Sequence, residues 1–451
     1  MAMTPAAPSP AIDTRLIWAI ALPAIVTNVA TAMIGIGDMW IVGRLGDASA
    51  QGAVDVGARL FAVLFTVMNF LKTGTTGLVA QAGTREGGGE QAATLLRGLL
   101  VGVIIGSGLL ALQPVILPFA LDALGARGAV REAAETYAGI RFWSAPFVMV
   151  NFAAIGFLVG QRRMTTVLIV EIAYNLLNLG LGLWFVLVLE WGIAGIGWSS
   201  LLAECAKSVA LAAILLRGTR GAALWDRARQ GRIAGLTQLV PFLAVNRDLF
   251  LRTVILTIAL AALTRLSAER GAVVLAANGI IYQMFILTAL LLDGFENAAQ
   301  VLNGERVGAG DRTGFADYIR AILLRGMLVA AMAAIGFALF GDALLASFAA
   351  TPDVARAAQD LGLWLVVIPF AGLAGFVFDG VYVGASWTRA LLLTMAGAAL
   401  VFAGALWLTW PLGSHGLWLS FTIFLVARAL FQAALLPRLI RRGFDESTSG
   451  S

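Results

Sequence analysis

Long apolar segments alternate with short polar ones along the whole chain of 451 residues. A helix that crosses the hydrocarbon core of a bilayer needs about 20 apolar residues, and more when it is tilted. The gaps between the segments contain the turn residues glycine, proline and aspartate, together with arginine. The pattern predicts an all-α polytopic membrane protein with twelve transmembrane helices, over residues 15–44, 52–82, 93–122, 132–159, 164–189, 194–217, 235–265, 273–303, 316–346, 355–383, 388–410 and 416–438.

The composition supports the membrane assignment. Hydrophobic residues make up 60% of the chain and charged residues 13%, whereas soluble proteins contain about 45–50% apolar and about 25% charged residues. A soluble fold with so few charges would leave much apolar surface in water. The 51 glycines are typical of a membrane bundle, in which small residues let helices approach one another closely.

The arginines fall unevenly on the two sides of the predicted bundle. With the amino terminus inside, most loop arginines face the cytoplasm, in agreement with the positive-inside rule. We therefore expect a multi-pass protein of a prokaryotic cytoplasmic membrane with both termini in the cytoplasm. The arginines assigned to the inner side are Arg85, Arg162, Arg163, Arg217, Arg220, Arg227, Arg229, Arg232, Arg306, Arg312, Arg389, Arg438, Arg441 and Arg442.

Two terminal segments and a charged middle segment divide the chain. The first residues are rich in proline and alanine, which predicts a disordered tail. The apolar run that follows is longer than that of a signal peptide, so we expect it to be kept as a helix. The predicted parts are a cytoplasmic tail 1–14, an amino-terminal lobe 15–217, a basic linker 218–233, a carboxy-terminal lobe 234–440 and a second tail 441–451.

The two predicted lobes resemble each other in sequence. Residues 139–216 can be aligned with residues 362–439, and the repeat distance is about six helices. An even number of spans per lobe makes the repeats parallel, related by an axis along the membrane normal. Coincidence between glycines is the alternative, but matched spacing runs through several loops. The matches include Pro146 with Pro369, Gly160 with Gly384, Gly192 with Gly413 and Gly195 with Gly416.

Several function classes are disfavoured by the scarcity of reactive side chains. Cys205 is the single cysteine and His415 the single histidine. One cysteine forms no intramolecular disulfide, and these residues are too few for a zinc site, so we expect no metal site and no catalytic residues. The net charge of +5 does not indicate nucleic-acid binding, because the arginines lie in loops rather than on one face.

Acidic residues inside apolar segments are costly and are functional candidates by default. The seventh span contains Asp248 between two arginines, so a structural ion pair and a ligand role are about equally favoured. In the fifth span, Glu171 follows two arginines by about two turns and could face a cytoplasmic vestibule. The remaining candidates are Glu204 in the sixth span, Asp293 and Glu296 on one face of the eighth, and Asp379 in the tenth.

Asp38 in the first span differs from the other acids. The cation nearest to it in sequence is Arg44, almost two turns away. A carboxyl group that is buried without a partner can bind and release a proton near neutral pH. Pro23 removes a backbone hydrogen bond from the same helix and lets it bend, which would link the charge of Asp38 to a hinge. The structural alternative is a polar residue that only marks the helix end.

Uncharged oxygens accompany the acids on the fourth to sixth spans. They come from Asn151, Asn175, Asn178 and Ser200. Together with a carboxylate, such oxygens could also bind a hard cation such as sodium. Each amide by itself is more often a hydrogen-bonding link between two membrane helices.

At these positions the sequence resembles the multidrug and toxic compound extrusion (MATE) family, in the branch typified by the DNA-damage-inducible F proteins. The resemblance covers nearly the whole chain in order and implies two six-helix lobes that exchange protons or sodium for amphipathic, cationic compounds. The stretches that carry it are Ala21-Leu-Pro23, Gly37-Asp-Met-Trp-Ile-Val-Gly-Arg-Leu-Gly46, Phe70-Leu-Lys-Thr-Gly-Thr-Thr-Gly77, Ile140-Arg-Phe-Trp-Ser-Ala-Pro146, Asn175-Leu-Leu-Asn178, Asn246-Arg-Asp-Leu-Phe-Leu-Arg-Thr253, Leu275-Ala-Ala-Asn278, Leu291-Leu-Asp-Gly-Phe295 and Phe378-Asp-Gly380.

The resemblance also implies roles for single residues. Asp38 matches the ion-coupling acid, Pro23 the bend-prone proline, and Asn178 and Ser200 the polar partners on the fifth and sixth helices. The family often carries an aspartate four residues after this asparagine, where this chain has Gly182. A site with one carboxylate fewer should bind sodium weakly, so protons are favoured and Asp38 is expected to act largely alone. Coupling through the acids of the second lobe stays open.

We therefore expect an antiporter that exports amphipathic, cationic drugs or toxic compounds in exchange for protons, with sodium as the less favoured ion. Substrate is expected to bind between the lobes. No cofactor is expected besides the transported ion, and the expected partners are small molecules and the bilayer, without nucleic acid or an obligate protein partner. Three alternatives stay open: a flippase for lipid-linked intermediates, a membrane-embedded enzyme and a channel.

Overall fold

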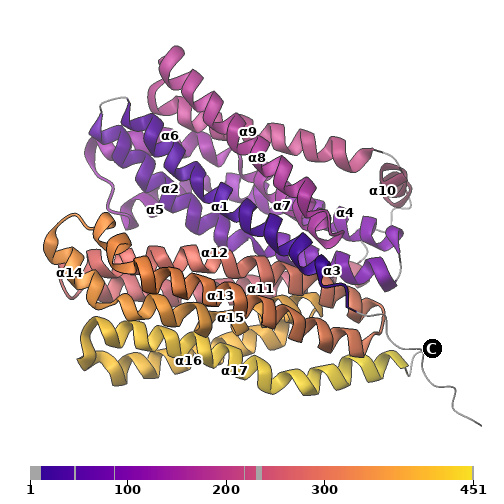
Figure 1. Ribbon diagram of the computed structural model, residues 1–451. Coiled ribbons are helices and arrows are strands. Elements are labelled where there is room, and N and C mark those ends of the chain that lie inside the picture. Colours follow the sequence, from indigo (N-terminus) through magenta and orange to yellow (C-terminus); the bar gives the residue numbers. More distant parts are fainter. Residues whose placement is uncertain (1–11, 45–46, 86, 218, 230–235, 449–451) are drawn as a thin grey trace, which may run out of the picture. The chain divides into compact units, whose positions relative to one another are not determined.

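The computed structural model describes residues 12–44, 47–85, 87–217, 219–229 and 236–448 (Figure 1). Most of the predicted amino-terminal tail, the ends of the predicted linker and residues 449–451 lie outside this range. No strand occurs among the described residues, as predicted. The helices are α1 (Arg15–Gly43), α2 (Ala48–Met68), α3 (Phe70–Arg85), α4 (Gly88–Ala111), α5 (Gln113–Ala123), α6 (Gly128–Phe142), α7 (Ala145–Gly160), α8 (Met164–Leu183), α9 (Gly192–Leu216), α10 (Thr219–Arg229), α11 (Leu236–Ala268), α12 (Ala272–Gly308), α13 (Arg312–Phe348), α14 (Pro352–Asp360), α15 (Gly362–Gly384), α16 (Thr388–Thr409) and α17 (Gly413–Thr448), with a π-helical turn at Trp184–Val188 and a 3-10 turn at Trp410–Leu412.

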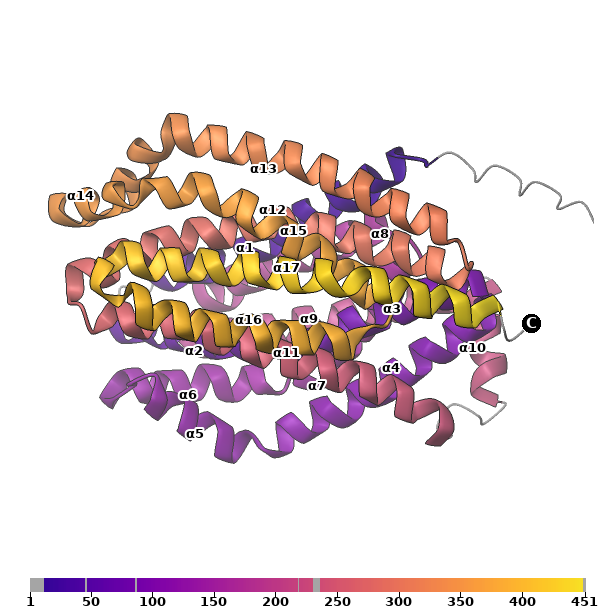
Figure 2. The ribbon, with the colours of Figure 1, turned by 90° about the horizontal axis from the view of Figure 1, so that it is seen from below.

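The predicted spans are confirmed within a few residues. Ten helical stretches in the described part of the chain are long and apolar enough to cross a membrane, and the pair α6 and α7 makes eleven. One of the ten, Thr388–Asp445, is 58 residues long and contains both α16 and α17. These two helices lie side by side, so counting them as separate spans gives the predicted twelve (Figure 1, Figure 2).

Two compact units are defined by the packing of the helices. The amino-terminal unit comprises residues 26–79 and 87–257, in which α4 packs on α7, α8 on α9, and α6 on both α2 and α9. The carboxy-terminal unit comprises residues 12–25, 80–85 and 258–448, in which α15 packs on α12, α13 and α17. The division passes through α1 shortly after Pro23.

Several predicted spans are interrupted by a break in the helix. The span predicted at 132–159 is the pair α6 and α7, which meet at an angle of 48° around Trp143 and Ser144. Other breaks fall at Asn69, Leu112 and Leu361. Each break replaces helical hydrogen bonds without changing the apolar character of the segment, so hydropathy alone does not reveal it.

The internal repeat is visible in matched helix ends. The α7 and α15 helices end at the matched residues Gly160 and Gly384, where a Cβ would lie 2.8 Å from a backbone oxygen of α3 and 2.3 Å from one of α12, respectively. Two residues later, Arg162 and Ser386 both adopt positive φ angles of 60° and 58°. The same backbone turn thus closes the equivalent helix in each unit.

A second matched pair begins the following helices. Gly192 at the start of α9 has a φ of 55°, and Gly413 at the start of α17 has a φ of 65°. Glycine adopts this left-handed conformation without the steric cost that a Cβ would add. The predicted correspondence therefore follows from a shared requirement of the backbone, in agreement with two related halves.

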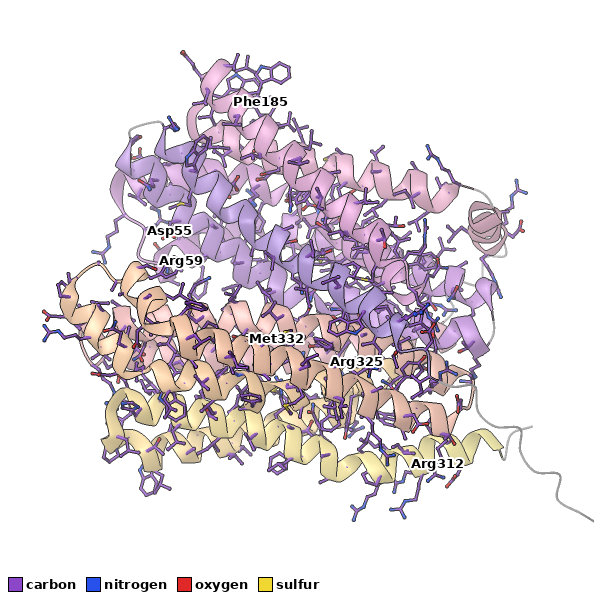
Figure 3. All side chains as sticks on the ribbon, viewed as in Figure 1. Asp55, Arg59, Phe185, Arg312, Arg325 and Met332 are labelled. Atoms are coloured by element: carbon purple, nitrogen blue, oxygen red, sulfur yellow. The ribbon has the colours of Figure 1, made fainter. Side chains whose placement is uncertain are left out.

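The outer faces of the helices carry apolar side chains. Leu324, Leu400 and Trp407 are exposed by 75%, 75% and 82%, and Met332 of α13 also projects outward (Figure 3). Such continuous apolar exposure suits contact with lipid and would be unstable in water. Charged pairs such as Asp55–Arg59 on α2 are exposed on one helix face (Figure 3).

Candidate functional site

Asp38 lies buried on α1, with 4% of its surface exposed. The residues on either side of it pack against α8. A Cβ on Gly37 would be 3.3 Å from Leu179, and a Cβ on Gly182 would be 2.9 Å from Ile41. These two close contacts fix the turn of α1 that contains Asp38 against the second half of α8.

Gly182 occupies the position on α8 where a second carboxylate of this site would stand. The Cδ1 atom of Ile41 occupies the space beside Gly182, and the hydroxyl of Ser199 would be 3.5 Å from a Cβ there. An aspartate at this position would have to displace the end of the Ile41 side chain. The glycine that departs from the family pattern thus lies where α1 packs closely on α8.

Asp38 has a charged neighbour on another helix. Arg141 of α6 acts electrostatically on Asp38, and Tyr137 lies beside Arg141. The Arg141 guanidinium donates a hydrogen bond to the Tyr137 hydroxyl and lies 4.8 Å from the ring centre of Phe61. Arg44, the cation nearest in sequence, instead lies over Trp40 at 4.6 Å.

The predicted polar partners are placed on facing sides of α8 and α9. The Asn178 amide donates a hydrogen bond to the Ser200 hydroxyl at 3.3 Å, and both residues are buried. Asn175 lies one turn earlier on α8. Both of its amide atoms are inaccessible to solvent and have no hydrogen-bond partner among the described residues. Buried polar atoms nearly always have a partner, so this amide can accept a ligand.

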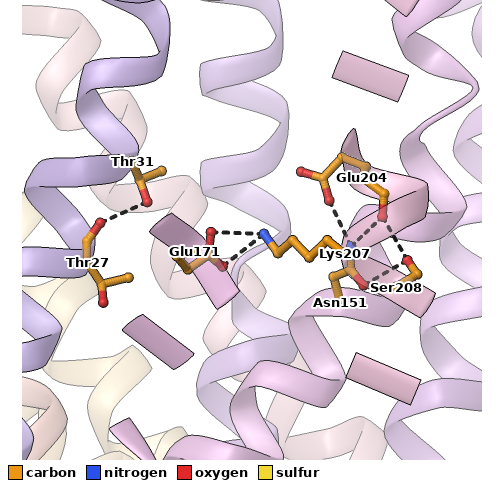
Figure 4. Close-up of polar contacts among 7 residues, drawn as sticks. All are labelled: Thr27, Thr31, Asn151, Glu171, Glu204, Lys207 and Ser208. Carbon is orange, nitrogen blue, oxygen red and sulfur yellow. Dashed lines mark hydrogen bonds and ion pairs between the residues drawn. The ribbon is translucent and has the colours of Figure 1, made fainter. Parts of the chain in front are cut away.

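A second group of polar side chains joins α7 to α9. The Asn151 amide donates to the Glu204 carboxylate at 2.8 Å and to the Glu204 backbone oxygen at 3.2 Å. Ser208 donates to the Asn151 side-chain oxygen at 2.8 Å (Figure 4). Asn151 therefore orients a buried carboxylate, a role that neither its position nor its residue type reveals in the sequence.

Glu171 is held in a buried ion pair. The Lys207 ammonium of α9 lies 2.8 Å from one Glu171 oxygen, and both side chains are 8% exposed (Figure 4). The expectation that Glu171 could face an open vestibule is therefore wrong in this structure. The same ammonium lies 4.3 Å from the ring centre of Tyr174, and Glu204 acts electrostatically on both Lys207 and Tyr174.

The acids predicted in the later helices have partners of their own. Asp248 forms an ion pair with Arg247 at 2.7 Å, and the Asn297 amide donates to Asp293 at 3.0 Å. In the carboxy-terminal unit, fully buried Arg428 and Asp379 lie 3.7 Å apart. The Gln432 amide donates to Asp379 at 2.6 Å, and Glu296 acts electrostatically on Arg428. Cationic side chains thus offset the charges of Asp248, Glu296 and Asp379.

Pro23 lies inside α1, which continues as a helix on both sides of it. In the carboxy-terminal unit this part of α1 packs on α12 at Gly294, where a Cβ would be 2.8 Å from the backbone oxygen of Ala21. The turn around Pro23 is thus held by one unit, and Asp38 belongs to the other. The hinge role of Pro23 remains a prediction.

Sequence reasoning missed the cations and tyrosines of the site, namely Tyr137, Arg141, Tyr174 and Lys207. The available signal was an arginine or lysine within an apolar run, which is as costly in a membrane as an acid. Arg141 and Lys207 both lie inside predicted spans, so the argument that singled out the acids applies to them as well. No group of three or more His, Cys, Asp or Glu side chains among the described residues is placed to hold a metal ion.

An apolar pocket of about 600 Å³ also lies in the amino-terminal unit. It contains no charged side chain, so it is not the ion site. Large apolar side chains form most of its wall, and several of them are exposed. The lining residues are Gln113, Thr136, Gly139, Ile140, Trp143, Phe147, Trp198, Leu201, Leu202 and Cys205.

Comparison with known proteins places this arrangement in a family. The MatE family model matches residues 23–184 and 249–406, which include Asp38, Asn178 and Asp379. The chain belongs to the MATE family. It is therefore a multi-pass membrane transporter of the multidrug efflux type, and not an enzyme.

Individual members of the MATE family support the assignment. The chain is 32% identical over 435 residues to DNA damage-inducible protein F of Escherichia coli (strain K12), covering 95% of this chain and 93% of that protein. A solved structure of MATE in the bent conformation is similar in fold, with a TM-score of 0.82, 18% identity and 98% of both chains covered. An outward-facing multidrug resistance MATE transporter of the MOP superfamily gives 0.81, with 17% identity over 95% of this chain and 96% of that chain.

Proposed function

We propose that this MATE transporter exports amphipathic, cationic compounds in exchange for protons, with Asp38 as the group that binds the coupling proton. The observation that carries this proposal is the burial of Asp38 beside Arg141 and Tyr137, in a position closed off from bulk water. A carboxylate in such a place responds strongly to any change in neighbouring charge.

The coupling follows from competition for one negative charge. Proton uptake from outside neutralises Asp38 and removes the attraction between the site and a cationic substrate. Substrate is then released outward, and loss of the proton to the inside restores the charged site. The unpartnered amide of Asn175 on α8 supplies further oxygen and nitrogen atoms for a water or a polar group of the substrate.

Protons are favoured over sodium by the chemistry of the donor atoms. A hard cation such as sodium is held by several oxygen ligands, and a second carboxylate would strengthen its attraction to the site. The position where a second carboxylate would stand is Gly182, and Ile41 fills the space beside it.

The cellular location and the orientation of the transporter are also part of the proposal. The transporter is proposed to lie in a cytoplasmic (inner) membrane with both termini in the cytoplasm, in line with the arginines of the loops. Cysteines placed one at a time at residue 12 and at Asp445 in a Cys205→Ala background should react with a membrane-impermeant maleimide only after the membrane is permeabilised. Labelling of either site in intact cells would contradict this orientation.

The experiment for the coupling role compares wild type with Asp38→Asn. Dye efflux is followed in vesicles under an imposed pH gradient, after insertion has been checked by size-exclusion chromatography of the extracted protein. We expect the variant to lose more than about tenfold of the gradient-driven rate. Undiminished efflux would remove Asp38 from the coupling site.

A further inference from the structure

Each unit buries a positive charge at the same position of the internal repeat. Lys207 of α9 and Arg428 of α17 are 9% and 1% exposed. Gly192 begins α9 and Gly413 begins α17, and each cation follows its glycine by 15 residues. Because the two glycines are matched in the repeat, Lys207 and Arg428 are matched as well.

In the amino-terminal unit, one helix supplies both an acid and an aromatic ring to the cation. The Lys207 ammonium lies 2.8 Å from an oxygen of Glu171 (Figure 4) and 4.3 Å from the ring centre of Tyr174. Glu171 and Tyr174 are three residues apart on α8, so they lie on one face of that helix. The acid offsets the charge of the ammonium, and the ring adds a cation–π contact.

The carboxy-terminal unit has the same arrangement, built from different residues. The Arg428 guanidinium lies 3.7 Å from an oxygen of Asp379 and 5.1 Å from the ring centre of Phe376. Phe376 and Asp379 are again three residues apart on one helix, here α15. This helix has a glycine where the guanidinium approaches it, since a Cβ on Gly375 would lie 2.7 Å from two nitrogens of Arg428.

The positive charge is the feature that the two units share. One cation is a lysine paired with a glutamate of α8, and the other is an arginine paired with an aspartate of α15. Replacing a buried ion pair by apolar residues is often neutral or stabilising, so stability by itself does not require a charge here. Charged side chains within membrane-spanning helices instead mark ion pathways and coupling sites. A basic side chain beside a buried carboxylate supplies the positive charge that a bound inorganic cation would otherwise supply.

We propose that Lys207 and Arg428 are tethered cations, which take the place of a free inorganic cation at Glu171 and Asp379 and thereby keep sodium from binding to either acid. This inference rests on the proposed function, in which protons at Asp38 drive export. It goes further, because it assigns the selectivity against sodium to two basic residues. A sodium ion that approached either acid would have to displace a charge that is covalently attached to a neighbouring helix.

The test removes one tethered cation at a time and measures sodium binding. Lys207→Met and Arg428→Met keep an unbranched side chain but remove the charge that faces the carboxylate. Unfolding midpoints of the purified transporter are compared in sodium chloride and in N-methylglucamine chloride at pH 8, where few protons compete for a carboxylate. Because an ion that binds only the folded state raises the midpoint, each variant should unfold about 2 °C or more higher in sodium. Wild type should unfold at the same temperature in both salts.

Two kinds of control variant make the outcome specific. Lys207→Arg and Arg428→Lys keep the charge and should be insensitive to sodium, as wild type is. The double variants, Lys207→Met with Glu171→Gln and Arg428→Met with Asp379→Asn, remove the acid as well and should lose the sodium effect. A methionine variant that gives no single peak in size-exclusion chromatography is replaced by its glutamine counterpart, Lys207→Gln or Arg428→Gln.

The possible results separate this inference from the proposed function. A sodium-dependent rise in the charge-removing variants, absent from wild type and from both kinds of control, supports the tethered cations. Its absence from a folded charge-removing variant, or its presence in the matching control, overturns the role of that residue. A rise in wild type that is lost in Asp38→Asn would contradict proton coupling instead, because it would place sodium at Asp38. A rise in wild type that persists in Asp38→Asn would overturn the inference, since sodium would then bind despite both basic side chains.

Discussion

At the scale of single residues, the first unit is organised by charges that only the folded chain brings together. Asp38 was found from its place in an apolar run, because an isolated acid there is costly whatever surrounds it. Arg141 and Tyr174 were not, because the acids that act on them, Asp38 and Glu204, lie on other helices. Arg44, the cation nearest to Asp38 in sequence, lies over Trp40 instead.

The Glu171–Lys207 pair yields a prediction on stability. Replacing Glu171 by glutamine removes the carboxylate that is paired with the buried Lys207 ammonium, and breaking a buried pair in this way costs about 3–5 kcal/mol in other proteins. We expect a clear fall in the midpoint of thermal unfolding in detergent. Glu269→Gln removes one partner of an exposed pair with Arg265 and is the matched control. Equal unfolding midpoints for Glu171→Gln and Glu269→Gln would show that the buried pair does not stabilise the fold more than the exposed one.

Gly182 yields a prediction on ion selectivity. Gly182→Asp alone should crowd the end of the Ile41 side chain, which occupies the space beside Gly182. Combined with Ile41→Ala, the aspartate has room and adds a second carboxylate near Asp38. The double variant should then show sodium-dependent dye binding that wild type lacks, measured by fluorescence titration with sodium or with N-methylglucamine as the counter-cation. Identical titrations with the two cations would argue against this account of selectivity.

At the scale of elements, the positions of the helices could be predicted from the sequence more accurately than the breaks within them. The length of each apolar run is set by the bilayer, so the spans could be read directly. The breaks at Asn69 and Leu112 depend on local hydrogen bonding and packing, which leave the hydropathy unchanged. The repeat was readable because its glycines, Gly192 and Gly413 among them, meet backbone requirements that other residues do not satisfy.

Gly384 provides the test of packing at this scale. A Cβ there would lie 2.3 Å from a backbone oxygen of α12, so Gly384→Ala forces α15 and α12 apart. Overpacking of this kind costs about 1–3 kcal/mol. Gly404→Ala in α16 is the control, because no atom lies within 4 Å of the added Cβ and alanine favours the helix. The midpoint of thermal unfolding in detergent should be lower for Gly384→Ala than for wild type. For Gly404→Ala it should be unchanged or higher.

At the scale of the whole molecule, α1 connects the proposed ion site to the rest of the transporter. Asp38 belongs to the amino-terminal unit, whereas the turn at Pro23 packs on α12 of the other unit. A proline weakens helical hydrogen bonding and so allows bending at low cost. A change in the charge of Asp38 is therefore expected to act on transport through the shape of this helix.

Pro23→Ala tests that connection. The alanine restores a backbone hydrogen bond and stiffens α1, so pH-driven efflux should slow. Binding of the dye should stay as in wild type, because the buried charged side chains of the amino-terminal unit are untouched. The efflux rate and the binding isotherm are measured on the same preparation. Efflux at the wild-type rate would remove the hinge from the mechanism.

The most direct test of proton-coupled export through Asp38 is dye efflux from proteoliposomes under two imposed gradients. A pH gradient, acidic on the side that receives the dye, is applied first, and a sodium gradient at equal pH on both sides is applied second. We predict efflux with the pH gradient only, and its loss in Asp38→Asn. Efflux driven by sodium alone, or pH-driven efflux that persists in Asp38→Asn, would contradict the account.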